Sequence, residues 1–397
     1  MTDSVLCINA GSSSVKFQLF EAGQGDELSL HFKGQLEGIG VKPRLVAEDA
    51  EGRSLVDQDF DAKEISDTGA AIPKLLGWLR AQLEGRLPTV IGHRVVFGGT
   101  RYAAPVEIDE QVLEHLHSLV PFMPLHLPPE LIPIETIREN LPELPQVAVF
   151  DTGFHHGHDE VTERFAVPEE LHREGLRRYG YHGISYEYIA QRLPEVAPDI
   201  AKGRVVVAHL GSGCSMCALV DGGSVEASMG FSALDGLPMG TRPGRLDPGA
   251  MLYLFQVKGM SAKEVETLLY RECGLKGLSG ISNDVRELLA SDDPGAKLAL
   301  DYFALHSARM VAELATVMGG IDGLVFTAGV GEKAAPVRAA IGAKLGWLGL
   351  EIDPTANAEH GPRISTGQSR IACYVIPTNE ELMIARHALA SVRSHER

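Results

Sequence analysis

A strand, a glycine- and serine-rich turn and a returning strand occur twice in this chain, and this repetition constrains the fold most. From 5 to 20, a short apolar run leads through Asn9-Ala-Gly-Ser-Ser-Ser into a second apolar run. From 205 to 220, the same order recurs around Gly211-Ser-Gly. Two apolar runs around a glycine-rich turn predict a β-hairpin. We therefore expect two domains built on one plan, each of which opens with a hairpin.

The rest of the chain alternates between helical and strand patterns. Residues 296–318 predict a helix with one polar face that ends at Gly319-Gly320, because glycines often end helices. An apolar strand pattern at 324–326 then runs into a glycine-rich turn. A last amphipathic pattern begins at Pro377 and continues to about Arg393. Alternating strands and helices indicate an α/β fold.

Composition excludes several kinds of partner. The formal net charge is -17 and no stripe of Lys and Arg occurs, whereas nucleic-acid binding depends on clustered cations. No apolar run approaches the roughly 20 residues that span a bilayer, and the start lacks a targeting signal. The five cysteines are scattered, which suits a reducing compartment. We expect a cytoplasmic protein with no nucleic-acid or membrane partner.

Three glycine-rich turns follow apolar strands, around Gly11, Gly211 and Gly329. Glycine allows the backbone to approach a ligand closely, and successive N–H groups can bind phosphate oxygens. The chain has neither the Gly-x-x-x-x-Gly-Lys-Ser/Thr loop of P-loop proteins nor a dinucleotide-binding fingerprint after its first strand. Two hairpin loops and a later strand-glycine loop instead match the architecture of actin, sugar kinases and chaperone ATPases.

Within that architecture, two long motifs resemble signatures of the acetate kinase family. They are Asn9-Ala-Gly-Ser-Ser-Ser-Val-Lys16 and Arg178-Tyr-Gly-Tyr-His-Gly-Ile-Ser. Five further segments follow the family's order: His93-Arg-Val-Val-Phe-Gly-Gly, Phe150-Asp-Thr-Gly-Phe-His, Met239-Gly-Thr-Arg, Asn283-Asp-Val-Arg and Thr378-Asn-Glu-Glu-Leu. The match extends from residue 5 to about residue 390.

The resemblance implies an α/β fold of two similar actin- and sugar-kinase-like (ribonuclease H-like) domains with an active-site cleft between them. It implies acetate kinase activity, the reversible, direct in-line transfer of the ATP γ-phosphoryl group to acetate, and to propionate as a further substrate. Mg²⁺, for which Mn²⁺ can substitute, and a homodimer are also expected. The expected domains are 1–150, with the first phosphate loop and part of the acyl site, 151–384, which binds the nucleotide, and 385–397, a helix that returns to the N-terminal domain.

Phosphoryl transfer depends on positioning and on charge neutralisation. A carboxylate acceptor is already ionised at neutral pH, so no general base is needed, and cations and hydrogen-bond donors should dominate the site. By the resemblance, Arg94 holds the carboxylate or the transferring phosphoryl group. Arg242 stabilises the equatorial oxygens, and His182 donates a hydrogen bond there. Asp151 directly follows the apolar strand 147–150 and is expected to hold Arg94.

The resemblance also assigns the metal, acyl and nucleotide sites. Asn9 and Glu380 are expected at Mg²⁺. The acyl site is expected to combine Arg94 with Val96, Leu125, Tyr181 and Ala233. The expected ATP contacts are Lys16, His209, Gly211, Ser212, Gly213, Asp284, Val285, Arg286, Gly329, Val330, Gly331, Glu332 and Lys333.

The chain departs from the family pattern at several of these positions. Ser212 and Lys333 stand where Asn is usual, and Arg245 stands in a loop that commonly ends in Asp. Tyr181 replaces Phe, and Ala233 replaces Pro. Because loss of the proline ring removes apolar volume from one wall of the acyl pocket, we expect propionate to be used at least as well as is typical for the family, with acetate still a substrate.

Helix capping distinguishes the roles of the adjacent residues Glu380 and Glu381. Thr378, followed three residues later by Glu381, predicts a capping box at the start of the last helix. This interpretation gives Glu381 a structural role and leaves Glu380 for the metal.

Three other patterns favour weaker hypotheses. His155, His156 and His158 resemble the start of a dinuclear metallohydrolase motif, but an exposed polar loop is the favoured interpretation. Cys214 and Cys217 have redox spacing, yet they lie in a predicted strand, which favours buried cysteines. The superfamily fold would also permit a nucleotide-gated binding or chaperone-like protein. Against it, no peptide-binding domain or helical lid follows the core.

Overall fold

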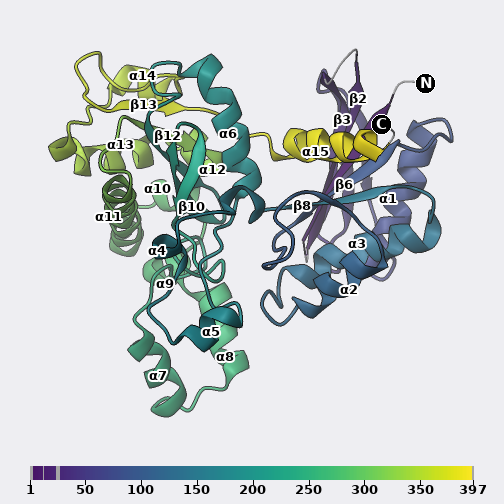
Figure 1. Cartoon of the computed structure of the whole chain (residues 1–397), viewed down its shortest axis with the longest axis horizontal. Coiled ribbons are helices and arrows are strands. Elements are labelled where there is room, and N and C mark those ends of the chain that lie inside the picture. The colour runs from purple at the N-terminus through teal and green to yellow at the C-terminus, as the bar shows by residue number, and fades with distance from the viewer. Residues whose placement is uncertain (1–2, 12, 24–26, 396–397) are drawn as a thin grey trace. The chain divides into compact units, whose positions relative to one another are not determined.

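The computed structural model describes the chain except for residues 1–2, 12, 24–26 and 396–397, so Ser12 of the first motif lies outside the described residues. The chain splits into two compact units. Unit 1 comprises Met1–Phe154 and Asn379–Arg397, and unit 2 comprises His155–Thr378. The divisions thus lie at 154 and 379, where the sequence suggested 150 and 385. Each unit is described by itself below (Figure 1).

Unit 1 is built on an eight-stranded sheet in the order β5-β4-β3-β2-β1-β6-β8-β7. Its strands are β1 (Ser4–Ala10), β2 (Ser14–Ala22), β3 (Leu28–Glu37), β4 (Arg44–Asp49), β5 (Ser54–Asp59), β6 (Val90–Val95), β7 (Val106–Glu107) and β8 (Gln146–Phe150). Its helices are α1 (Thr68–Gln82), α2 (Glu110–Ser118), α3 (Leu127–Asn140) and α15 (Glu380–His395).

Alternation of side chains along β1 explains how helices cover both faces of this sheet. Leu6 and Ile8 belong to one buried cluster with Leu75 of α1. Cys7 lies between them and points to the other face, where its Sγ is 3.2 Å from the carbonyl oxygen of Glu381 in α15. The first strand therefore packs α1 on one side and the C-terminal helix on the other.

The close approach of α15 to the sheet depends on a glycine in β6. A Cβ added to Gly92 would lie 2.6 Å from Cγ2 of Ile384 and 3.1 Å from Cβ of Ala388, so a larger residue would push the helix away. In Figure 1, α15, the yellow helix, lies in the same unit as the purple N-terminal strands. The two ends of the chain thus complete one sheet and its cover.

Unit 2 contains a five-stranded sheet in the order β11-β10-β9-β12-β13. Its strands are β9 (Arg204–Leu210), β10 (Cys214–Val220), β11 (Gly223–Ala227), β12 (Gly323–Thr327) and β13 (Ala372–Val375). Its helices are α4 (Glu160–Glu163), α5 (Glu169–Arg173), α6 (Gly183–Val196), α7 (Pro248–Gln256), α8 (Ala262–Thr267), α9 (Gly274–Ser279), α10 (Val285–Leu289), α11 (Pro294–Val317), α12 (Ala328–Lys333), α13 (Ala335–Lys344) and α14 (Pro354–Ala358).

The same five-strand plan occurs in both units, as the repeated hairpin predicted. In unit 1, β1 and β2 form an antiparallel hairpin, and β1 pairs parallel to β6, which pairs parallel to β8. In unit 2, β9 and β10 form the hairpin, and β9 pairs parallel to β12, which pairs parallel to β13. The third strands, β3 and β11, also pair antiparallel to β2 and β10.

The long helix α11 has the ends that its sequence predicts. Asp293 caps its start by accepting a hydrogen bond from the N–H of Gly295, and Pro294 occupies the first turn, where a missing N–H does no harm. After Met318, Gly319 adopts φ 68°, the left-handed conformation that commonly ends a helix. Within the described residues, none of the helices is both long and apolar enough to cross a membrane.

Candidate active site

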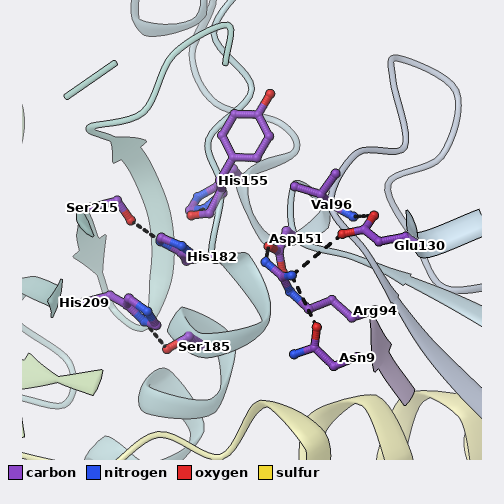
Figure 2. A network of polar contacts seen from close by, with 11 residues as sticks. Asn9, Arg94, Val96, Glu130, Asp151, His155, His182, Ser185, His209 and Ser215 are labelled. Atoms are coloured by element: carbon purple, nitrogen blue, oxygen red, sulfur yellow. Dashed lines mark hydrogen bonds and ion pairs between the residues drawn. The ribbon is translucent and has the colours of Figure 1, made fainter. Parts of the chain in front are cut away.

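Arg94 lies near the end of β6 in unit 1 and is surrounded by acceptors. Its Nε donates to Oδ1 of Asp151 at 3.2 Å, and its Nη2 donates to Oδ2 of the same carboxylate. Its Nη1 makes a long hydrogen bond of 3.5 Å to Oδ1 of Asn9. Asp151 directly follows β8, the parallel neighbour of β6, and is 1% exposed. The expected pairing of Asp151 with Arg94 is therefore present (Figure 2).

The charges around Arg94 hold it as a cation. Burial alone lowers the pKa of its guanidinium, but the charges of Asp151, Glu380 and Glu130 outweigh burial, and the pKa is raised. The planar guanidinium can bind a carboxylate or phosphoryl group through two parallel hydrogen bonds. Arg94 is thus an oriented cation where a parallel strand ends, a place where open α/β sheets bind ligands.

Sequence reasoning missed Glu130, a buried carboxylate on α3. Its Oε2 accepts a hydrogen bond from the N–H of Val96 at 2.9 Å, and its Oε1 is 3.8 Å from Nη1 of Arg94 (Figure 2). Burial raises the pKa of Glu130 to about 8, although the charge of Arg94 opposes the shift. A signal did exist: Glu130 stands on the buried face of α3 at helical spacing from Leu127 and Ile134.

Unit 1 contains two of the residues expected in the acyl site, Val96 and Leu125, and both precede Glu130 in the sequence. Val96 directly follows β6 and is 3% exposed, and its N–H is held by Glu130. Leu125 lies just before α3 and is partly buried. Unit 1 therefore supplies one cation and two apolar side chains of the expected acid site.

The residues expected at Mg²⁺ in this unit have the chemistry that the ion prefers. Asn9 lies on β1 directly before its end, and Glu380 is the first residue of α15. Burial raises the pKa of Glu380 to about 7; Asp151 adds to the shift, and Arg94 and Lys16 oppose it. A divalent cation would favour the ionised form, and Mg²⁺ takes few carboxylate and amide oxygens beside its waters. This donor set fits the ion.

The expected capping box at the start of α15 is wrong. The side chain of Asn379, one residue after Thr378, accepts the hydrogen bond from the N–H of Leu382 at 3.0 Å. The hydroxyl of Thr378 instead accepts a hydrogen bond from Ser185 at 2.9 Å. Asn is at least as good a cap as Thr, and the tertiary contact engages Thr378 elsewhere. Glu381 therefore has no role as the box residue.

In unit 2, His182 occupies a strained position at the start of α6. Its φ is 60°, an uncommon conformation for a residue with a side chain, and such strain gathers at functional sites. Nδ1 of His182 is 2.8 Å from Oγ of Ser215, which is 2.5 Å from the hydroxyl of Tyr186. The ring stacks on His209 with centroids 4.2 Å apart. These contacts fix the orientation of the imidazole ring. Ser215 contacts Nδ1, and Nε2 lies on the other side of the ring.

The expected ATP residue His209 belongs to the same stack. It is the next-to-last residue of β9, and its Nδ1 is 2.9 Å from Oγ of Ser185 (Figure 2). Ser185 in turn donates to the hydroxyl of Thr378. A chain of polar side chains therefore links β9, α6 and the end of unit 2.

The turn between β9 and β10 brings backbone close to His182 and Arg242. A Cβ added to Gly213 would lie 3.2 Å from Nε2 of His182 and 4.0 Å from Nη1 of Arg242. Nη1 of Arg242 also donates to the carbonyl oxygen of Ala233 at 3.0 Å. A glycine turn, an imidazole and a guanidinium thus share one small region of unit 2, an arrangement suited to binding an anion.

The acyl-site residues of unit 2 flank a single loop. Tyr181 is 1% exposed, and its hydroxyl donates to the carbonyl oxygen of Phe231 at 2.7 Å. Ala233, two residues later, is 5% exposed and accepts the bond from Arg242. The extra hydroxyl of Tyr181 is therefore bonded to the backbone of this loop.

The stretch 155–160 is only partly the exposed polar loop that its sequence suggested, because His156 is exposed whereas His155 is buried. His155 is 3% exposed, and its Nε2 donates to the carbonyl oxygen of Tyr181 at 3.1 Å. Its Nδ1 must then accept from the hydroxyl of Ser224 at 2.8 Å, and the same hydroxyl oxygen accepts from Nε2 of His158 at 2.8 Å. Among the described residues, no group of three or more His, Cys, Asp or Glu side chains could hold a metal.

Most of the other expected ATP residues lie on or cap two short helices, and Lys16 lies on β2 of unit 1. Gly329, Val330, Gly331, Glu332 and Lys333 form most of α12, whose first residue, Ala328, has φ 63°. Asp284 caps α10 and pairs with Arg286, which lowers the pKa of Asp284 to about 2; Val285 is the first residue of that helix. Ser212 and Lys333, the two departures from the family pattern, are both exposed.

Arg338, which sequence reasoning missed, holds the C-terminal end of α12. Arg338 is fully buried, and its Nη1 donates to the carbonyl oxygens of Gly331 and Glu332 at 2.9 and 2.8 Å. Its Nε donates to Oδ1 of Asn357 at 2.8 Å. These carbonyls end a helix and would otherwise lack partners, so Arg338 holds the glycine-rich segment in place.

The structure also accounts for Arg245, to which the sequence gave no role. Its Nη1 and Nη2 donate to the carboxylate of Glu313 on α11 at 2.7 and 2.5 Å. Asp235 lies 4.0 Å from its Nε. Arg245 therefore fastens the loop after Arg242 to the long helix. Cys214 and Cys217 are buried on β10 and form no disulfide, and their burial was expected.

Comparison with known proteins gives a consistent result. The model of the acetokinase family matches residues 4–386. Acetate kinases of Nitrobacter hamburgensis and Rhizobium meliloti are 54% and 53% identical to this chain, over 98% of its length and 96% and 98% of theirs. The crystal structure of a propionate kinase from Francisella tularensis is 36% identical with a TM-score of 0.90, and covers 98% of this chain and 99% of its own.

A second solved structure, the acetate kinase of Porphyromonas gingivalis, is 31% identical with a TM-score of 0.86, and covers 98% of this chain and all of its own. Similarity at this level over whole chains confirms the expected class, an α/β fold of the actin- and sugar-kinase-like type.

Proposed function

As a member of the acetokinase family, the chain is a phosphotransferase with a carboxyl group as acceptor, and we propose that it transfers the γ-phosphoryl group of ATP to acetate. The observation that carries the proposal is the convergence on Gly213 of His182 and Arg242, with Nε2 and Nη1 3.2 and 4.0 Å from where a Cβ would stand. Hydrogen-bond donors and a cation around a glycine turn suit a phosphoryl group that gains charge in transit.

The proposed reaction is a direct in-line transfer. A carboxylate oxygen of acetate forms a bond to the γ-phosphorus as the bond from that phosphorus to the bridging oxygen of ADP breaks, and the products are acetyl phosphate and ADP. Arg94, oriented by Asp151, binds the carboxylate or the transferring group. Arg242 stabilises the equatorial oxygens, and His182 donates a hydrogen bond to them. No general base is required because acetate is ionised at neutral pH.

The nucleotide is assigned to unit 2, with Lys16 of unit 1 as a further phosphate contact. The proposed contacts are the turn 211–213 with His209, the α10 residues with Asp284, and the α12 segment 329–333, which Arg338 holds. Asn9 and Glu380 are proposed to hold Mg²⁺, with Mn²⁺ as a substitute. When bound, the ion would neutralise charge on the β- and γ-phosphate oxygens.

Propionate is proposed as a second substrate. Ala233 leaves more apolar space than proline would, and the Tyr181 hydroxyl is bonded to Phe231 and does not fill that space. One methylene in an apolar pocket changes binding by roughly 1–3 kcal/mol, so a small space can accommodate the longer acid. A similar protein of known structure is a propionate kinase, which supports this part of the proposal.

We also propose a homodimer that uses the outer face of α7. This helix is apolar, yet none of its residues is buried, and Leu252, Tyr253 and Phe255 are 54%, 48% and 40% exposed. In Figure 1, α7 lies at the end of unit 2 that is farthest from β12 and β13. Exposed apolar groups gathered on one helix are typical of an interface. Light scattering should give a dimer for the wild type and a monomer for Leu252→Glu with Phe255→Glu.

The proposed activity is tested by trapping acyl phosphate as its hydroxamate. Wild-type protein with ATP, Mg²⁺ and acetate should form acetyl hydroxamate after hydroxylamine is added, and should form none when ATP is omitted. ATP hydrolysis without acyl phosphate would instead support a nucleotide-gated binding protein. A cytoplasmic location, which the scattered cysteines without disulfides favour, is proposed with this activity.

A further inference from the structure

Glu130 is the feature of unit 1 that the proposed reaction does not use. It is a carboxylate, 4% exposed, in a region that is proposed to bind a second carboxylate. One of its oxygens holds the N–H of Val96 at 2.9 Å, and the other faces Nη1 of Arg94 at 3.8 Å. It therefore touches both the cation and one apolar wall of the acid site, and it comes from a third element, α3.

When Glu130 is ionised, its negative charge repels the carboxylate of an acid bound at Arg94. Arg94 already shares its charge with Asp151, which is bonded to two of its nitrogens. A substrate carboxylate would place a further negative charge within reach of the same guanidinium, and like charges that share one site disfavour ionisation. The charged groups that act on Glu130 are Arg94, from β6, and Asp151, at the end of β8.

We propose that Glu130 is a positioning residue of the acid site, which holds the Val96 amide and competes with the substrate carboxylate for Arg94 when it is ionised. Acid binding is then linked to the protonation of Glu130. The raised pKa of this group, about 8, supports the linkage because both forms occur near neutral pH. The proposal rests on the proposed role of Arg94 as the acid-binding residue.

The test compares KM for acetate and KM for ATP in wild type and Glu130→Gln from pH 6.5 to pH 9. Gln can still accept the Val96 N–H but cannot ionise. Because the protonated fraction of a group falls about tenfold for each pH unit above its pKa, the KM for acetate should be about tenfold lower in Glu130→Gln than in wild type at pH 9, and within about twofold at pH 6.5. The KM for ATP should show no such divergence.

The matched control is Glu135→Gln, which removes a carboxylate from the same helix at its surface, where Glu135 pairs with His117. Its two KM values should follow those of the wild type. Equal KM for acetate in Glu130→Gln and wild type at pH 9 would overturn the proposal. So would a rise in both KM values at every pH, since that pattern describes a merely structural residue.

Wild-type protein gives an independent measurement if Glu130→Gln does not fold. Calorimetry of acetate binding at pH 8.5, in two buffers of different ionisation enthalpy, should show proton uptake of up to one per acetate. Zero uptake would overturn the linkage. If the wild type forms no acyl phosphate, or if Arg94→Ala leaves the KM for acetate unchanged, the proposed function or its acid site fails. Glu130 is tested separately, by the pH-dependent difference between two active proteins.

Discussion

Replacement of His155 by Gln should make the protein less stable than wild type at neutral pH and more stable than wild type at acidic pH. Burial, together with the nearby His158, lowers the pKa of His155 to about 3 from an ordinary value of 6.5. Below pH 6.5 the unfolded chain binds a proton on this histidine and the folded protein does not. The free energy of unfolding therefore falls as the pH drops from 6.5 towards 3.

The loss of unfolding free energy is set by the pH interval below 6.5, the ordinary pKa of histidine. Between pH 6.5 and pH 5 the loss is about 2 kcal/mol, at 1.36 kcal/mol per pH unit. Gln places its Nε2 near that of His155, so the bond to the Tyr181 carbonyl can survive, while the bond from Ser224 is lost. That loss costs about 1 kcal/mol at either pH. The variant should be less stable than wild type by about 1 kcal/mol at pH 7.5, and more stable by about the same amount at pH 5.

Urea unfolding followed by far-UV circular dichroism at the two pH values measures this crossover. His156→Gln is the matched control, because His156 is the exposed neighbour; its curves should stay parallel to those of the wild type. If His155→Gln keeps the same deficit at pH 5 as at pH 7.5, the imidazole is not held neutral by its buried contacts and the assigned bonds are wrong.

Three further predictions concern turnover and substrate choice. Arg242→Ala should lower kcat on the order of 10³-fold with little change in KM for the acid; a variant with more than about a tenth of wild-type kcat would remove Arg242 from the mechanism. Glu380→Gln should raise the Mg²⁺ concentration required for half-maximal rate, and Glu381→Gln should not; magnesium titrations with the opposite result would refute the metal assignment. Ala233→Pro should raise the kcat/KM ratio of acetate to propionate, and an unaltered ratio would contradict the pocket hypothesis.

Patterns that are local in the sequence predicted the fold well. Each hairpin is two apolar runs around a glycine turn, and both hairpins form with the expected pairing. The pair of Arg94 with Asp151 was also predictable. Each follows or ends an apolar strand, and the carboxyl ends of neighbouring parallel strands meet at one edge of a sheet.

Contacts between distant segments could not be predicted in the same way. Glu130 meets a backbone amide 34 residues away, and His155 meets Ser224, 69 residues away. Neither partner leaves a periodic trace in the sequence, because a single polar contact depends on how whole elements pack. For Glu130 the available sign was its helical spacing from Leu127 and Ile134, which indicates the buried face of α3 but not the group that the carboxylate meets.

The capping error at the last helix has a different cause. Thr378 and Asn379 are both good helix caps, so the local pattern fits two starting points that differ by one residue. The choice is made by Ser185, which donates to the hydroxyl of Thr378 and leaves Asn379 to cap the helix. Local rules thus narrowed the helix start to two residues, and a tertiary hydrogen bond selected one of them.

Unit 1 is built from two separate segments of the chain, and this affects when it can finish folding during translation. Met383, Ile384, Ala388 and Leu389 of α15 are buried, and this helix covers one face of a sheet whose strands all lie before residue 151. Until α15 leaves the exit tunnel, that face lacks this helix, whereas His155–Thr378 is continuous and can close its own core. The part of the enzyme that is translated first is therefore the part that finishes folding last, and a nascent chain stalled before Asn379 would carry a folded unit 2 and a unit 1 whose sheet still exposes the face that α15 covers.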